Sequence, residues 1–171
     1  MTMNRTLRLT LLLPLLCASA LCAAQNTRTD RQQPVNIEAD RMTIDDRNKT
    51  NVFEGSVVMS QGSLEIRGDR VVISQGADGF QRGVATGNNR LATFRQKREG
   101  TNTYIEGEAE RIEYDSRAER ARLFGRARVS SAGDVVTGDF IEYDALTEKY
   151  TASRAQSSRG RVRAVIQPRS N

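Results

Sequence analysis

An internal repeat constrains the fold of this chain more than any other feature of its sequence. When the sequence is shifted by 70 residues, identical residues coincide: Glu38, Ala39, Arg41, Asp45, Arg47, Gly55, Ser60, Gly68 and Asp69 match residues 108, 109, 111, 115, 117, 125, 130, 138 and 139. A repeat of this length indicates a supersecondary unit that is built twice and stacked on itself. The repeat therefore determines the architecture.

Each half contains one strand pattern twice, at residues 35–44, 64–73, 105–114 and 134–143. In every copy apolar residues alternate with polar ones, which is typical of a strand with one buried face. Partway through each copy the alternation shifts by one residue, which indicates a β-bulge or a corner. The acids at the shift are Asp40, Asp69, Glu110 and Asp139. We expect their carboxylates to accept hydrogen bonds from backbone N–H groups that the corner leaves unpaired.

Further alternating stretches lie between these copies, at residues 53–59 and 123–129. Short strands with a period of two, separated by frequent Gly or Asn turns, predict an all-β protein. A long sheet that bends at regular intervals buries one face against itself, as in a sandwich, a jelly roll or a β-solenoid. We expect one such domain across residues 35–168.

The N-terminus is typical of a secretory signal peptide. Arg5 and Arg8 precede an apolar run at residues 9–16, and small residues follow up to Ala24. The run is too short to span a hydrocarbon layer of about 30 Å as a helix. We therefore expect residues 1–24 to be a cleaved signal peptide and the remainder to be exported.

Two further expectations concern the chain ends. Residues 25–34 are polar and aperiodic, which predicts a disordered lead-in, and residues 169–171 form a short tail. A lipoprotein is the alternative to cleavage after Ala24, because Cys17 and Cys22 lie near the end of the apolar run. Each of these cysteines follows a leucine where a small residue is usual, and this favours the cleaved signal.

The composition excludes most catalytic chemistry. The chain has no His, and both cysteines lie inside the signal, so the exported part has neither the usual general base nor a thiol. Four glutamates cluster at residues 106, 108, 110 and 113, but they follow strand alternation and predict an outward polar face. No Walker loop or dinucleotide motif occurs in the sequence. We expect no enzyme activity, no cofactor and no metal.

The charge distribution argues against nucleic acid as a partner. The chain has 26 basic and 21 acidic residues, which give a formal net charge of +5. The basic residues alternate with acids instead of forming one block, and the chain offers no Trp for base stacking. We expect a solvated surface of mixed charge and no nucleic-acid binding.

Five stretches of the sequence together resemble one known family: PVNIEAD at 34–40, VFEGSV at 52–57, GDRVV at 68–72, ATFRQ at 92–96 and IEGEA at 105–109. Over residues 34–168 the chain is similar to the OstA-like family of periplasmic lipopolysaccharide-transport proteins. The resemblance implies an open, slightly twisted β-jelly roll of two facing antiparallel sheets with a V-shaped interior. It also implies a periplasmic carrier that shields the acyl chains of lipid A in an apolar groove.

The resemblance further implies protein partners. Members of the family bridge an inner-membrane-anchored LptC-like protein of the same fold and the periplasmic domain of an outer-membrane LptD-like translocon. They also bind further copies of themselves head to tail by adding edge strands. In this chain the expected open edges are the first strand, from Val35, and the last strand, at residues 161–167.

Strand alternation selects the residues that would line the groove and bind lipid. They are Val35, Ile37, Leu64, Ile66, Ile73, Phe94, Ile112, Tyr114, Ile141 and Tyr143. The resemblance assigns lipid contacts in particular to Val35, Ile37, Phe94 and Tyr114. Ordinary core packing is the alternative for all of these positions.

Arginines such as Arg95, Arg117 and Arg159 are candidates for meeting lipid phosphates at the rim, because a guanidinium pairs bidentately with phosphate; a purely solvated position is the alternative. Two other functions also remain open. The membrane-anchored partner of the same fold would keep its N-terminal segment. A self-assembling structural β-protein would bind no lipid.

Overall fold

The computed structural model describes residues 27–77, 79–155 and 160–168. This part contains the 3-10 helix η1 (Thr27–Gln32) and the strands β1 (Asn36–Glu38), β2 (Arg41–Asp45), β3 (Thr50–Gln61), β4 (Leu64–Gly76), β5 (Gly79–Thr86), β6 (Ala92–Lys97), β7 (Tyr104–Ala109), β8 (Arg111–Asp115), β9 (Arg120–Ser131), β10 (Asp134–Asp144), β11 (Lys149–Ser153) and β12 (Arg163–Val165). No helix in these residues is long and apolar enough to cross a membrane. The expected signal at 1–24 and the tail at 169–171 lie outside the described residues.

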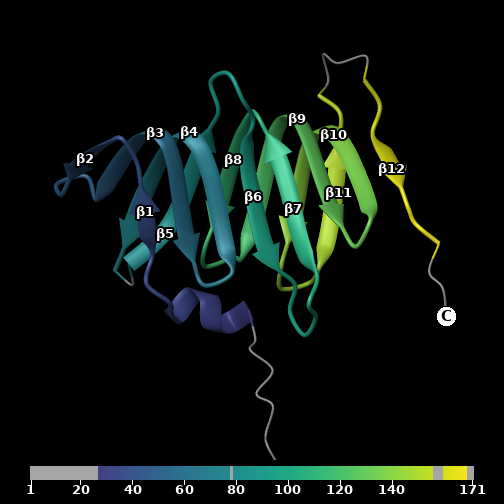
Figure 1. Cartoon of the computed structure of the whole chain (residues 1–171), viewed down its shortest axis with the longest axis horizontal. Coiled ribbons are helices and arrows are strands. Elements are labelled where there is room, and N and C mark those ends of the chain that lie inside the picture. The colour runs from purple at the N-terminus through teal and green to yellow at the C-terminus, as the bar shows by residue number, and fades with distance from the viewer. Residues whose placement is uncertain (1–26, 78, 156–159, 169–171) are drawn as a thin grey trace, which may run out of the picture.

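Four long strands, β3, β4, β9 and β10, turn a corner and pair with different neighbours on each side of it. On one side they form the sheet β2-β3-β4-β5-β8-β9-β10-β11, which we call wall A. On the other side they form β1-β3-β4-β6-β7-β9-β10-β12, which we call wall B. All these pairings are antiparallel, and Figure 1 shows β6 and β7 of wall B lying over β8 of wall A. The expected all-β fold of two facing antiparallel sheets is confirmed.

The sequence repeat is also a repeat of strand pairing. Asn36 of β1 pairs with Ser60 of β3, and 70 residues later Glu106 of β7 pairs with Ser130 of β9. The pairing of β4 with β6 recurs in the same way in the pairing of β10 with β12. Strands β5 and β6, which end the first half, pair with β8 and β7, which begin the second half. One continuous trough therefore results from two joined copies of one unit.

The corners of β3 and β9 depend on paired residues in the left-handed region. Gly55 and Ser56 have φ values of 83° and 46°, and Gly125 and Arg126 have values of 74° and 49°. The register of β3 against β4 shifts at the first pair, and that of β9 against β10 shifts near the second. This is the β-bulge that the parity change predicts, and it keeps the apolar side chains facing inward in both walls.

The acids at the parity change stabilise the corners in two ways. Asp69 accepts a hydrogen bond from the Asn88 N–H at 2.6 Å, and Asp139 accepts one from the Ala155 N–H at 2.9 Å, which confirms the expected role for these two. Asp40 and Glu110 instead lie over Gly55 and Gly125, at positions that a Cβ atom on either glycine would occupy. These glycines are thus required both by their backbone angles and by a close side-chain approach.

The lead-in expected to be disordered at 25–34 differs from that prediction, because Thr27–Gln32 folds as η1 and docks on wall B. Asp30 accepts hydrogen bonds from the Ser63 N–H at 2.9 Å and the Ser63 hydroxyl at 2.5 Å. The Gln61 side-chain amide donates to the carbonyl oxygens of Arg31 and Gln33 at 3.3 and 3.1 Å. The β3–β4 turn therefore satisfies the polar groups of a segment that has no apolar periodicity of its own.

The close approach at the second corner can be tested with Gly125→Ala. We expect this variant to lose about 2–3 kcal/mol of unfolding free energy in urea denaturation, because the new Cβ meets Glu110 and φ is positive. The matched control is Gly100→Ala, whose φ of 67° is also positive but which has no atom within 4 Å of the new Cβ; it should lose about 1 kcal/mol.

Shortening the neighbour with Glu110→Ala in the Gly125→Ala background should restore part of the loss. Equal losses for the two glycine variants, with no recovery in the double variant, would contradict the close-approach account.

Candidate functional site

The interior between the two walls is a single apolar cluster that contains the predicted lining residues. Eight of them are buried, each at most 3% exposed: Leu64, Ile66, Ile73, Phe94, Ile112, Tyr114, Ile141 and Tyr143. Val35 and Ile37 are partly buried and pack against this cluster. The structure thus brings all ten positions together on the inner face of the trough. Their side chains also pack against one another, so the centre of the trough is filled.

A row of aromatic rings runs through this interior. The ring centroids of Phe80 and Tyr114 are 6.3 Å apart, those of Tyr114 and Phe94 6.1 Å, those of Phe94 and Tyr143 6.5 Å, and those of Tyr143 and Tyr150 5.1 Å. Sequence reasoning missed Phe80 and Tyr150, the two ends of the row. Tyr150 alternates with Ala152 in the burial pattern of β11, so the period of two contained a signal for it.

The interior is electrically neutral at the row. Burial raises the pKa of the Tyr114 and Tyr143 hydroxyls well above the ordinary value, so both stay protonated near neutral pH. Among the described residues, no group of three or more His, Cys, Asp or Glu could hold a metal ion. The lining therefore offers shape and apolar contact, which suits hydrocarbon.

The edge of the trough opposite the corners, which we call the mouth, is bridged by side chains. Arg98, after β6 of wall B, donates to Glu148, before β11 of wall A, at 2.6 and 3.3 Å. Arg31 of η1 lies 3.6 Å from Glu119, in the β8–β9 turn of wall A. These contacts link the walls without backbone pairing.

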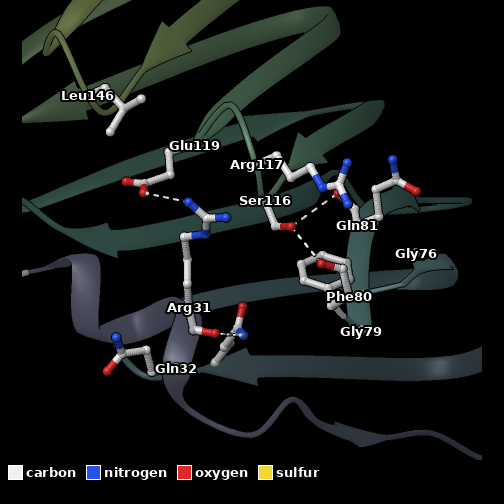
Figure 2. Close-up of a pocket in the computed structure, with 11 residues that line it drawn as sticks. Arg31, Gln32, Gly76, Gly79, Phe80, Gln81, Ser116, Arg117, Glu119 and Leu146 are labelled. Atoms are coloured by element: carbon white, nitrogen blue, oxygen red, sulfur yellow. Dashed lines mark hydrogen bonds and ion pairs between the residues drawn. The ribbon is translucent and has the colours of Figure 1, made fainter.

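Two cavities flank the aromatic row. The mouth cavity has a volume of about 550 Å³ and lies between η1 and the turns of wall A, with Arg31, Phe80, Arg117 and Glu119 in its lining (Figure 2). The end cavity has a volume of about 640 Å³ and lies near β12; its lining includes Val129, Val136, Tyr150, Ala164, Val165 and Ile166. Both volumes are in the usual range for small-molecule sites. Because Phe80 and Tyr150 line one cavity each, the row connects the two.

The three arginines considered for lipid phosphate lie in different places. Arg95 is on the outer face of β6, 3.3 Å from Glu106 and with its guanidinium over the Tyr104 ring. Arg117 lines the mouth cavity. Arg159 lies outside the described residues.

The two ends of the trough expose apolar residues that the repeat buries elsewhere. Met42 and Ile44 of β2 are 56% and 55% exposed, whereas their counterparts Ile112 and Tyr114 of β8 are 0% and 3% exposed. The difference arises because β5 pairs with β8, while no strand in the described residues covers the corresponding edge of β2. At the other end, Val162, Val165 and Ile166 are exposed as well.

Comparisons with known proteins agree with this architecture. The lipopolysaccharide export system protein LptH of Pseudomonas aeruginosa is 31% identical over 146 residues, which cover 82% of this chain and 83% of LptH. LptA of Escherichia coli K12, a protein of the same description, is 30% identical over 168 residues, covering 98% of this chain and 88% of LptA.

The crystal structure of LptH from Pseudomonas aeruginosa, titled the LptA-homologous periplasmic component of the conserved lipopolysaccharide transport device, superposes with a TM-score of 0.76 at 30% identity; the match covers 82% of this chain and 99% of that one. The open β-jelly-roll type of fold expected from the sequence is thereby confirmed. The family described as LptA/(LptD N-terminal domain) LPS transport protein matches residues 36–149. The chain therefore belongs to this family.

Proposed function

We propose that this protein is a periplasmic carrier of lipopolysaccharide that holds the acyl chains of lipid A between its two walls. The observation that carries the proposal is the apolar interior, in which an aromatic row connects two cavities. Relatives that share the fold over most of the chain are named for lipopolysaccharide export, which supports the choice of cargo. The carrier needs no catalytic group, cofactor or metal for this task.

The physical problem is the exposure of hydrocarbon to water. An acyl chain of about twelve carbons costs about 9 kcal/mol to expose, at about 0.8 kcal/mol per CH₂. Because side chains fill the centre of the trough, the walls must part along the row to admit a chain. Side-chain contacts such as Arg98–Glu148 bridge the mouth, so the walls can part there while the backbone ladders at the corners stay intact.

In this role the segment at 1–24 directs export to the periplasm and is removed. The folded part then joins an inner-membrane-anchored LptC-like protein at one end and the periplasmic domain of an LptD-like translocon at the other, through further copies of itself where needed. Edge-strand addition is the mode of contact, because unpaired N–H and C=O groups at a strand edge favour another strand.

The join between the two halves supplies a template for the join between copies. Phe94 of β6 pairs with Gly107 of β7, and these positions recur 70 residues away as Ala164 of β12 and Ile37 of β1. The same pairing between copies would bring Ala164 of one copy opposite Ile37 of the next. A large side chain would then face a small one, as Phe94 faces Gly107.

Charges on the outer face of wall A fit the same register. Arg82, Asp115, Arg120, Asp144 and Lys149 are directly paired across five neighbouring strands and alternate in sign. The ladder ends on a positive charge at β11, since Lys149 pairs in β10 as Arg82 pairs in β4.

By the template, Lys149 would face Asp45 of β2 in the next copy and extend the alternation. Burial of Met42 and Ile44, which β2 leaves exposed, would add an apolar contribution to the same contact.

Lipid contact can be tested with a photo-crosslinking residue at Phe94, in the chain starting at residue 25. We expect ultraviolet light to attach lipopolysaccharide to this position, because Phe94 faces the interior. The matched control is Thr93, the preceding residue, whose side chain is exposed on the outer face of the same strand. Labelling of the protein alone at Phe94, or equal lipid labelling at both positions, would contradict the carrier and favour a packed structural β-protein.

The register between copies can be tested with engineered cysteines, since a chain without residues 1–24 contains none. Mixing Ala164→Cys with Ile37→Cys should give a disulfide-linked dimer under mild oxidation, measured by non-reducing electrophoresis. Mixing Ala164→Cys with Glu38→Cys should give much less, because residue 38 faces the opposite side of the strand. Equal yields from both mixtures would exclude this register.

A further inference from the structure

The mouth cavity differs from the rest of the trough in its polarity. Arg31, Arg117 and three glutamines contribute to its lining, while Phe80 joins it to the aromatic row. Figure 2 shows the Arg31 guanidinium reaching across the gap from η1 toward Glu119 and Ser116 of wall A. The cavity therefore lies where the apolar interior meets a polar, positively charged opening.

Arg31 is held by its backbone, whereas its side chain keeps capacity for another partner. The Gln61 amide fixes the Arg31 carbonyl at 3.3 Å, so η1 stays in place. The Arg31 Nη1 to Glu119 Oε1 distance is 3.6 Å, well beyond the roughly 2.7–2.9 Å of a charge-assisted hydrogen bond. The Arg31 side chain is 45% exposed, against 5% for Glu119.

The charges around the cavity favour an anion over a cation. Its lining includes two guanidinium groups, Arg31 and Arg117, and one carboxylate, Glu119. The nearby carboxylate of Asp30 is occupied by Ser63, which donates to it through both its N–H and its hydroxyl. An oxyanion can thus approach Arg31 with Glu119 as the carboxylate that competes for it.

We propose that the mouth cavity binds the phosphorylated sugar head group of the lipid whose tails lie in the trough, with Arg31 exchanging the Glu119 carboxylate for a phosphate. This rests on the proposed carrier function. A guanidinium matches phosphate oxygens bidentately, and glutamine side chains donate to and accept from sugar hydroxyls. Adjacent polar and apolar sites fix where the tails begin, which a uniformly apolar trough cannot do.

Arg31→Gln and Glu119→Gln make a paired test, because the proposal predicts opposite effects for them. Apparent Kd values are measured by displacement of a fluorescent acyl probe, with lipid A that carries both phosphates and with the same lipid after their removal. Arg31→Gln should weaken binding of the phosphorylated lipid about tenfold and leave the dephosphorylated lipid unchanged. Glu119→Gln should tighten binding of the phosphorylated lipid about threefold, because Arg31 loses its competing partner.

The matched control is Arg122→Gln. Arg122 is 41% exposed, close to Arg31, and binds Glu142 at 2.7 Å on the outer face of wall A. This variant should bind both lipids as the unaltered chain does. Inorganic phosphate is the remaining arm and should displace phosphorylated lipid only at concentrations of tens of millimolar or above, as expected for about one or two exposed ion contacts.

The outcomes separate the two proposals. If both lipids bind equally and Arg31→Gln changes neither, the head-group site is wrong while the carrier stands. If Arg31→Gln and Glu119→Gln both weaken both lipids, Arg31 and Glu119 only hold the mouth together and the head-group site is again wrong. Phosphate alone that binds as tightly as the lipid would assign the cavity to a free oxyanion instead. Absence of binding by either lipid would refute the carrier function itself.

Discussion

The whole fold depends on backbone ladders that turn a corner without breaking. In β3 and β9 a glycine and the residue after it adopt left-handed angles, and the register moves on around them. A one-residue change of parity at the corner compensates for the change of direction, so the same apolar face points inward in both walls. Without that shift, one wall would turn its polar side chains into the interior.

This constraint explains how much of the molecule was predictable from its sequence. The repeat and the parity changes at Asp40, Asp69, Glu110 and Asp139 have a period, and they led to the two-walled fold and to ten positions that lie on one inner surface. The contacts across the mouth have no such signal. Arg98 and Glu148 are 50 residues apart, and η1 docks through polar groups of the β3–β4 turn. Pairs of this kind arise only when the strands are in place.

Neutral tyrosines inside and charged groups at the opening divide the trough as an amphiphile is divided. Burial keeps Tyr114 and Tyr143 protonated, so hydrocarbon would meet no fixed charge along the row. Successive troughs of similar lining would bury similar areas of an acyl chain, and transfer between them would change the free energy little. In the proposed transport, the direction of flow must then come from an energy source elsewhere in the assembly.

The shared register of the inner and outer joins bears on how such a protein evolves. Since one half already ends in the edges that the next half begins with, duplication of the segment would lengthen the conduit without inventing a new surface. Deletion of one half would leave compatible ends in the same way. Conduit length could thus vary in half-molecule increments, whether the increments are encoded in one gene or recruited as separate chains.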